Sequence, residues 1–355
     1  MSMYNNNERI SARGYAVFSK TDTFKPFDFT RHPVGDHDVL IEILYAGICH
    51  SDIHSARSEW KDGIYPMVPG HEIAGRIVAV GSKVSKFKVG DLAGVGCMVN
   101  SCGECEACKR SQEQFCERGQ TVFTYDCKDC FHNDEPTYGG YSNNIVVSER
   151  FAIKVPDGAP LDKVAPLLCA GITTYSPLKF SGVKKGSRVG VAGFGGLGMM
   201  AVKYAVQMGA EVSVFARNEN KKEDAIKMGV KHFFTSTQNV KERFDLIIST
   251  IPSGYDPMKY VNLLVYGGEF AIVGLPPRDQ NPMINLTELV WGAGRKVYGS
   301  LIGGIKETQE MLDFSLEHKI YPETEIISAN QIDEAYEKLT TGRAKFRYVI
   351  DMKTL

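Results

Sequence analysis

The feature that most constrains this chain is a run of four closely spaced cysteines, Cys102-x2-Cys105-x2-Cys108-x7-Cys116. Four thiolates in one loop can form a closed tetrahedral shell around a zinc ion. Because the protein would fill all four positions, none remains for a substrate, and the spacing predicts a structural zinc site. Free or disulfide-linked cysteines and an iron–sulfur cluster are the alternatives.

The other cysteines and the overall charge limit the function further. The chain has nine cysteines, and eight of them lie between Cys49 and Cys130. An odd, clustered set fits metal binding better than a disulfide framework, and the polar segment Met1–Ile10 does not read as a signal peptide, so we expect a cytoplasmic protein. The net charge is −1. We therefore expect no nucleic-acid partner, and no apolar run reaches the ~18 residues of a membrane span.

The pattern along the chain indicates two kinds of architecture. The first half is β-rich, with short apolar runs such as Val39–Tyr45 and Gly75–Val80 between turn signals. From about Pro156 onward, strands alternate with helices, which predicts a parallel sheet built from βαβ units. The expected strands here are Arg188–Ala192, Glu211–Ala216, Phe244–Thr250, Glu269–Val273, Lys296–Leu301 and Phe346–Met352, and the expected helices are Met199–Met208, Lys221–Met228 and Glu307–His318.

A glycine-rich turn follows the first of these strands. The segment Gly193-Phe194-Gly195-Gly196-Leu197-Gly198 satisfies G-x-G-x-x-G and opens a predicted helix. In that context it is a dinucleotide fingerprint, because the glycines allow a tight turn and a close approach of the pyrophosphate to the helix N-terminus. The residues expected to contact the cofactor are Gly193, Gly195, Gly196, Leu197 and Gly198.

The end of the second strand indicates which dinucleotide is bound. A site for NAD usually has an acidic residue there to hold the ribose hydroxyls. This chain has Ala216 followed by Arg217, with Lys221 close by. A missing carboxylate and a planar cation favour a 2′-phosphate, so we expect NADP(H). In the alternative interpretation, Arg217 is a solvated strand end and Glu219 holds the ribose.

A second, dispersed set of possible metal ligands is Cys49, His71, Glu72 and Cys169. A mixed sulfur, nitrogen and oxygen shell with an open position is typical of a catalytic zinc. The spacing of these four residues is by itself only a weak indication of a metal site. An isolated buried cysteine is more often a small core residue, and a lone His-Glu pair more often lies at the surface.

These motifs, in their order along the chain, resemble those of the zinc-dependent medium-chain alcohol dehydrogenases, and more narrowly their cinnamyl alcohol dehydrogenase branch. The resemblance spans about Gly14 to Met352. Beside the four-cysteine lobe, it is carried by Gly47–His54, Tyr65–Glu72, Pro166–Tyr175, Val191–Gly193 and Gly299–Gly303.

The resemblance implies roles for the dispersed set. Cys49, His71 and Cys169 would bind a catalytic zinc, in addition to the structural one. Glu72 would be a direct ligand or a neighbour that exchanges with water or substrate. Asp52 would orient His71 through its other ring nitrogen.

The resemblance also implies a proton path and further cofactor contacts. The hydroxyl of Ser51 would protonate the product alkoxide, with the proton coming through the cofactor ribose from His54, whose reference pKa of ~6.5 suits this step. His50 would contact the cofactor pyrophosphate. The remaining positions assigned to the cofactor are Thr173, Asn218, Lys221, Thr250, Val273, Gly274, Ser300, Ile302 and Arg347.

The substrate pocket implied by the resemblance contains Trp60, Met98 and Leu301. Large apolar side chains favour aromatic or long-chain aldehydes over ethanal. The lignin-pathway enzymes carry an aromatic residue where this chain has Leu301. We therefore expect a broad reductase of aromatic and aliphatic aldehydes rather than a dedicated lignin enzyme.

The fold implied is a GroES-like catalytic domain over residues 1–156 and 300–355, and a Rossmann NADP(H)-binding domain over residues 157–299. The family implies a homodimer joined through the cofactor domains. The expected function is a zinc- and NADP(H)-dependent alcohol dehydrogenase, with small-molecule aldehydes and alcohols as partners. The alternatives are an NAD-dependent polyol or simple alcohol dehydrogenase, a zinc-free quinone reductase, and an NADP(H)-sensing zinc-ribbon regulator.

One pair of cysteines departs from the family pattern. Cys127-x2-Cys130 lies in an insertion-like segment after Tyr125. We interpret the pair as ordinary loop cysteines. A redox pair and a third metal site are the alternatives, and the absence of a βαβ context disfavours a thioredoxin-like motif.

Overall fold

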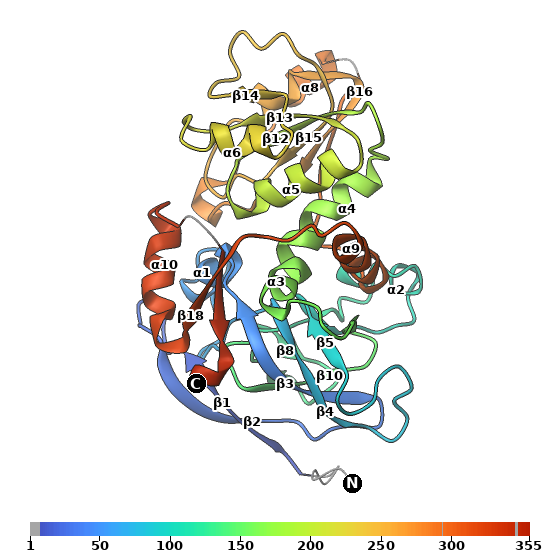
Figure 1. Cartoon of the computed structure of the whole chain (residues 1–355), viewed down its shortest axis with the longest axis vertical. Helices are drawn as coiled ribbons and strands as arrows, with labels where there is room; N and C mark the ends of the chain where they lie inside the picture. The colour runs from blue at the N-terminus through green and yellow to red at the C-terminus, as the bar shows by residue number, and fades with distance from the viewer. Residues whose placement is uncertain (1–7, 293, 345–346) are drawn as a thin grey trace. The chain divides into compact units, whose positions relative to one another are not determined.

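The structure, a computed structural model, describes residues 8–292, 294–344 and 347–355. The chain forms two compact units, each described by itself (Figure 1). The first unit continues to Cys169 and resumes over Gly304–Leu316 and Tyr321–Leu355, and the second comprises Ala170–Gly303 and Glu317–Ile320. No helix within these described ranges is long and apolar enough to cross a membrane.

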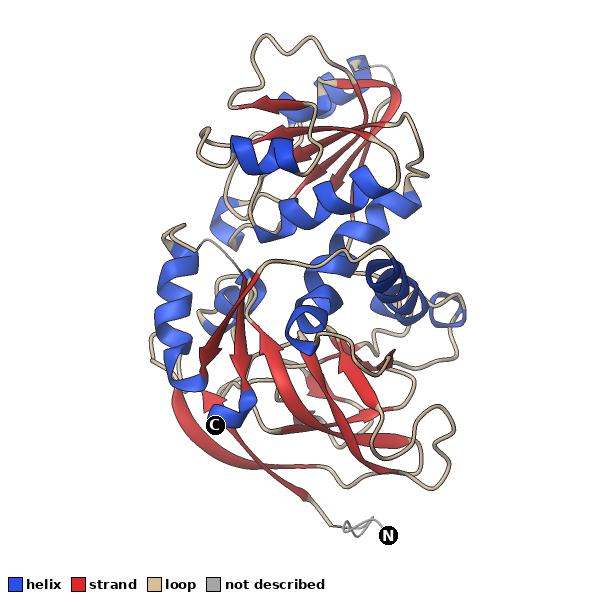
Figure 2. Ribbon diagram, in the orientation of Figure 1, coloured by secondary structure: helices blue, strands red, loops and turns tan. Residues whose placement is uncertain are grey.

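Strands dominate the regular structure of the first unit (Figure 2). Its main sheet has the order β11-β5-β4-β3-β19-β18, and β10 also pairs with β3. These strands are β3 (Asp38–Gly47), β4 (Ile73–Val80), β5 (Leu92–Val95), β10 (Asn144–Ser148), β11 (Ala152–Val155), β18 (Thr324–Ser328) and β19 (Arg347–Asp351). A separate hairpin joins β1 (Ile10–Ala16) to β2 (Lys25–Arg31), and the short strands are β6 (Met98–Asn100), β7 (Val122–Phe123), β8 (Lys128–Asp129) and β9 (Glu135–Pro136).

The pairing of β19 with β3 explains why the first unit is discontinuous in sequence. Val349, Ile350 and Asp351 lie opposite the end of β3 in an antiparallel ladder. The apolar C-terminal strand therefore completes a sheet begun by the N-terminal half. Residue 346, which the sequence analysis included in this strand, lies outside the described residues. The helices of this unit are α1 (His50–Ala56), α2 (Glu106–Lys109), α3 (Leu161–Pro166), α9 (Ile305–Glu317) and α10 (Ile332–Thr340).

The second unit is built on one parallel sheet. Its order, β14-β13-β12-β15-β16-β17, reads 3-2-1-4-5-6 in the order along the chain, which is the doubly wound dinucleotide-binding arrangement. The strands are β12 (Arg188–Ala192), β13 (Glu211–Phe215), β14 (His232–Phe234), β15 (Phe244–Ser249), β16 (Leu264–Ile272) and β17 (Lys296–Gly299), and the helices are α4 (Ile172–Phe180), α5 (Gly196–Gln207), α6 (Lys222–Lys227), α7 (Met258–Val261) and α8 (Leu286–Trp291). The predicted parallel sheet is thus confirmed.

Two elements of this sheet differ from the expectation. The sequence analysis missed β14, which has only three residues and no alternating pattern. It also began β16 at Glu269, whereas the strand starts at Leu264 and includes two glycines. The core between these strands holds Phe215, Phe244 and Phe270, which are almost completely buried.

The boundary between the units falls later in the sequence than the predicted domain boundary. The expected cofactor domain began at residue 157, while the first unit extends to Cys169. The reason is α3, which packs against β3, β4 and β19 of the first sheet. Its residues Val164, Ala165 and Pro166 are buried there.

Candidate functional site

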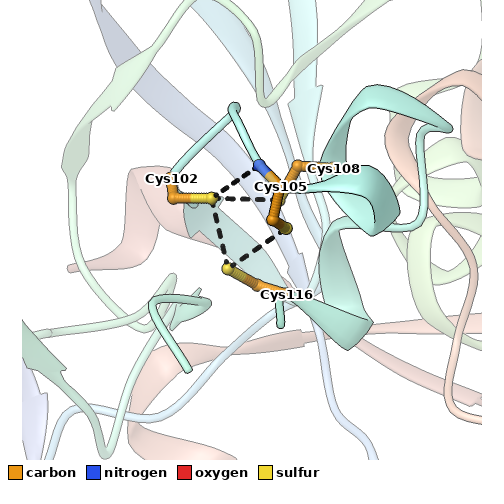
Figure 3. A group of neighbouring side chains, drawn as sticks. All are labelled: Cys102, Cys105, Cys108 and Cys116. Atoms are coloured by element: carbon orange, nitrogen blue, oxygen red, sulfur yellow. Dashed lines mark hydrogen bonds between the residues drawn. The ribbon is translucent and has the colours of Figure 1, made fainter. Parts of the chain in front are cut away.

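The four cysteines of the predicted structural site converge in one lobe (Figure 3). The sulfur of Cys102 lies 3.7 Å from that of Cys108 and 3.5 Å from that of Cys116, and Cys105 and Cys116 are 3.9 Å apart. Tetrahedral zinc with Zn–S bonds of ~2.3 Å places its sulfurs about 3.8 Å apart. The donor set therefore fits a zinc ion without rearrangement.

The backbone of the lobe favours the thiolate form of Cys102. The amides of Glu104 and Cys105 both donate to the sulfur of Cys102, each at 3.4 Å. Both hydrogen bonds lower the pKa of the Cys102 thiol, and the one from the Cys105 amide has the larger effect. The carboxylate of Glu113 accepts from the amide of Ile305 at the start of α9, which fastens the lobe to the first unit.

The dispersed set also converges, and each member comes from a different local structure. Cys49 is the N-cap residue of α1, directly after β3. His71 and Glu72 precede β4. Cys169 lies on a turn of π-helix, Leu167–Gly171, a distortion often found at functional sites.

Glycines bring these segments close enough to meet. A Cβ at Gly47 would lie 2.1 Å from a carboxylate oxygen of Glu72, and one at Gly94 would lie 2.4 Å from the side chain of Leu168. The first glycine lets Glu72 approach the end of β3. The second lets the π-helical turn settle on β5, which positions Cys169.

All four side chains of the dispersed set are buried. Their possible ligand atoms lie within 4.8 Å of one another. Nε2 of His71 is 3.1 Å from the sulfur of Cys169, which is 3.9 Å from the sulfur of Cys49. Two sulfurs, an imidazole nitrogen and a carboxylate fit the donor set of a catalytic zinc.

Asp52 fixes the orientation of His71. The Asp52 carboxylate accepts hydrogen bonds from Nδ1 of His71 (3.0 Å), the amides of Gly70 (3.1 Å) and Cys49 (2.8 Å), and the hydroxyl of Tyr141 (3.1 Å). Because Nδ1 must carry its proton to donate, Nε2 keeps its lone pair and faces the sulfurs. This carboxylate–histidine pairing is typical of metal sites.

Glu72 lies near the sulfurs of Cys49 and Cys169, and it also pairs with Arg347. One carboxylate oxygen accepts from the Arg347 guanidinium, and the other is buried without a hydrogen-bond partner. Burial raises the pKa of Glu72 to about 8, against the opposing pull of Arg347. The orphaned oxygen, Oε2, is the atom available to a metal ion.

The predicted proton-path residues lie on and beside α1. The hydroxyl of Ser51 is 3.6 Å from the sulfur of Cys49. His54 is only 7% exposed, so it does not itself reach bulk water. Its Nδ1 lies 2.5 Å from the carboxylate of Glu59, and its Nε2 is buried without a hydrogen-bond partner. Its ring stacks on that of Trp60, with the ring centroids 4.8 Å apart.

The glycine-rich turn forms an anion cradle between β12 and α5. Gly193 has a φ of +93°, which favours glycine, and a Cβ at Gly198 would lie 2.0 Å from the carbonyl oxygen of Gly193. Gly195 faces open space, and α5 has no side-chain cap. The free amides of the first helical turn can therefore bind a phosphate.

The end of β13 presents a cation rather than an acid. Arg217 is exposed two residues after Phe215, whose carbonyl accepts from the amide of Gly193. Glu219, the alternative ribose ligand, forms an ion pair with Lys222 at 3.0 Å. Among the described residues, Arg217 has no recorded acidic partner, so its guanidinium can receive a phosphate.

The other predicted cofactor and substrate residues are divided between the units. Thr250, Val273, Gly274 and Ser300 follow the carboxyl ends of β15, β16 and β17, where ligands bind in open parallel sheets. The second unit also holds Thr173, Asn218, Lys221, Leu301 and Ile302, while the first unit holds His50, Trp60, Met98 and Arg347. Met98 is only 2% exposed, whereas Leu301 is 38% exposed.

Two residues that the sequence analysis did not select belong to this arrangement. Glu59 lies five residues after His54, close enough in sequence for the pair to have been considered. Tyr141 lies 89 residues from Asp52, and no local signal connects them. Arg347 was selected as a cofactor ligand, but its contact with Glu72, 275 residues away, was not foreseen.

The chain is similar to known families and proteins over most of its length. Residues 35–157 match the alcohol dehydrogenase GroES-like domain, which agrees with the predicted fold class, and residues 196–317 match the zinc-binding dehydrogenase family. The probable formaldehyde dehydrogenase AdhA of Bacillus subtilis is 49% identical, with 94% of this chain and 95% of the relative covered.

Two solved structures are also similar. The crystal structure of CAD from Helicobacter pylori complexed with NADP(H) is 66% identical, with a TM-score of 0.95 over 98% of this chain and 99% of that one. A cinnamyl alcohol dehydrogenase from Sorghum bicolor is 36% identical, with a TM-score of 0.92 over 97% and 98% of the two chains.

Proposed function

Because this chain belongs to the zinc-dependent medium-chain alcohol dehydrogenases, in their cinnamyl alcohol dehydrogenase branch, we propose that it reduces aldehydes reversibly with NADPH. The observation that carries the proposal is the convergence of Cys49, His71, Glu72 and Cys169. The cation-bearing end of β13 and the glycine cradle support NADP(H) as the cofactor.

The chemistry divides between the bound groups and the side chains. When bound at Cys49, His71 and Cys169, zinc supplies a Lewis acid for the carbonyl oxygen, and NADPH supplies the hydride. Asp52 holds the proton on Nδ1 of His71, so that Nε2 remains a ligand. Arg347 donates a hydrogen bond to Glu72 and keeps that side chain beside the site.

The proton that completes the alcohol follows side chains of α1. The hydroxyl of Ser51, next to Cys49, donates to the product oxygen. His54 would restore that proton, and Glu59 connects Nδ1 of His54 to solvent. The side chain of Glu59 is 32% exposed, while that of His54 is 8% exposed, which makes the carboxylate the outer member of the pair.

The proposed substrates are aromatic and longer aliphatic aldehydes. Trp60 presents a large ring beside His54, and Leu301 is an exposed apolar side chain rather than an aromatic one. None of the nine cysteines forms a disulfide bond, which agrees with the reducing conditions of the cytoplasm, the location that we propose.

A steady-state assay with zinc-loaded protein tests this function. Benzaldehyde, cinnamaldehyde and ethanal are compared as substrates, with NADPH and with NADH. We expect turnover of the first two with NADPH and weaker turnover of ethanal. No NADPH oxidation with any aldehyde would refute the proposed function.

The substitution Arg217→Ala should weaken NADPH binding and leave NADH binding nearly unchanged. A charge-assisted hydrogen bond contributes about 1.5–3 kcal/mol, so KM for NADPH should rise by roughly 10- to 100-fold. The KM values for both cofactors, at saturating benzaldehyde, measure the effect. Lys227→Ala, which removes an exposed cation at the end of α6, is the control. An equal rise for NADPH and NADH would show that Arg217 does not contact the 2′-phosphate.

We also propose a homodimer formed through the second unit. β17 lies at an edge of the parallel sheet, where its unpaired backbone groups can join a second copy. On nearby segments of the sequence, Met283, Leu286, Val290 and Trp291 are 71–84% exposed. Large apolar side chains exposed this close together in the sequence support an interface here.

The double substitution Val290→Glu and Trp291→Glu should therefore produce a monomer. Two buried carboxylates on each subunit, without partners, would cost several kcal/mol at the interface. Size-exclusion chromatography with light scattering measures the mass directly. Ile226→Glu changes an exposed apolar residue on α6, which packs at the opposite, β14 edge, and should leave the dimer intact. A double variant that keeps the mass of a dimer would exclude this surface.

A further inference from the structure

A group of two histidines and a carboxylate lies in the first unit, outside the sites described above. His32 follows β2, Asp38 begins β3, and His132 lies in the turn between β8 and β9. One ligand atom of each residue lies within 4.8 Å of those of the other two, and all three side chains are half-buried. The dehydrogenase chemistry uses none of them.

The hydrogen bonds of the two rings leave one nitrogen of each available. Nδ1 of His32 lies 2.9 Å from the carbonyl oxygen of Pro33, and Nδ1 of His132 lies 2.7 Å from the carboxylate of Asp129. A carbonyl and a carboxylate can only accept, so both Nδ1 atoms donate. Each neutral ring therefore keeps its lone pair on Nε2, the arrangement found where histidines ligate metals.

The two rings are already side by side. Their centroids are 3.6 Å apart and their planes differ by 7°. A metal ion lies near the plane of each imidazole that ligates it, so binding requires one ring to tilt out of the parallel stack. The ring of His132 is 30% exposed and sits on a short turn, which gives it room to do so.

The charges around the rings favour a cation. A carboxylate oxygen of Asp38 lies 4.0 Å from Nδ1 of His32, and Asp129 bonds to His132. Glu135 lines a pocket together with His32, Asp129 and His132. Two guanidiniums oppose them. Arg9 is paired with Glu135, and the buried Arg31 donates to the carbonyls of Tyr138 and Gly139 and to Ser142.

We propose that His32, Asp38 and His132 bind a third divalent transition-metal ion, of the class that includes Zn²⁺. Two imidazoles and one carboxylate suit such ions, and water would fill the remaining positions. Asp129 supports the site through Nδ1 of His132. The ion would fasten the insertion-like segment that carries Cys127 and Cys130 to the start of β3, a role separate from the proposed reaction.

Metal counting on the intact protein tests the proposal. Protein that already holds its two zinc ions is dialysed against micromolar Zn²⁺, and bound zinc per chain is measured by elemental analysis. We expect one additional ion in the unmodified protein. His132→Phe, which keeps a ring against His32 but removes the nitrogens, should lower the affinity for this ion by at least about 10-fold.

Two more variants and a second readout complete the experiment. Asp38→Asn should also weaken the additional ion, while His37→Phe, which removes a histidine whose side chain is 64% exposed, should not. The additional ion should raise the melting temperature of the unmodified protein and not that of His132→Phe. No additional ion, an ion retained in His132→Phe, or an equal loss in His37→Phe would each overturn the proposal.

Discussion

Replacement of Cys169 by serine should abolish aldehyde reduction while leaving the second unit able to bind NADPH. Cys169 supplies one of the two sulfurs of the proposed catalytic site, 3.1 Å from Nε2 of His71. Its loss removes a ligand and the Lewis acid with it, which accounts for several kcal/mol of transition-state stabilisation. We expect kcat/KM for benzaldehyde to fall by about 10³-fold or more.

Three measurements distinguish this outcome from simple unfolding. Zinc content should fall from two ions per chain to one, NADPH affinity by fluorescence titration should stay within a few-fold of the unmodified value, and the melting temperature should change little. Cys130→Ser, which alters an exposed thiol outside both clusters, is the matched control and should keep full activity. Cys169→Ser protein with normal turnover would show that the dispersed set is not catalytic.

Replacement of Cys105 by serine should instead destabilise the protein. The lobe has few apolar side chains of its own, and its buried cluster consists of Cys105, Cys108 and Cys116. The free energy of zinc binding to such a lobe contributes directly to the stability of its fold. The free energy of unfolding should fall by several kcal/mol. Because each kcal/mol shifts the melting temperature by about 2–4 °C, the melting temperature should fall by roughly 10 °C.

The activity of the folded Cys105→Ser protein decides whether the four-cysteine site is structural or catalytic. At low temperature, where the variant remains folded, kcat should lie close to that of the unmodified protein, while thermal denaturation and limited proteolysis should report an unstable lobe. Cys130→Ser again provides the control. A variant with a normal melting temperature but no catalysis would mean that these cysteines serve the reaction rather than the fold.

Much of the fold could be predicted because its signals are local. The strand Arg188–Ala192 and the glycine turn that follows it need only neighbouring residues to define them, and the structure has both as predicted. The missed strand His232–Phe234 is held by its pairing with β13 rather than by its own pattern. Similarly, α3 joined the first unit because of tertiary packing, which the sequence does not display.

The sequence by itself determined which chemical groups are present and which of them are close along the chain. The spacing of Cys102, Cys105, Cys108 and Cys116 predicts a zinc-binding lobe because all four thiols lie within one short segment, with the close spacing typical of zinc ligands. Only the tertiary structure decided the pairings between distant segments. Glu72 meets Arg347 because β19 pairs with β3, and His32 meets His132 because the β8–β9 turn lies beside the end of β2. Such contacts depend on strand register and loop placement, which the whole fold sets.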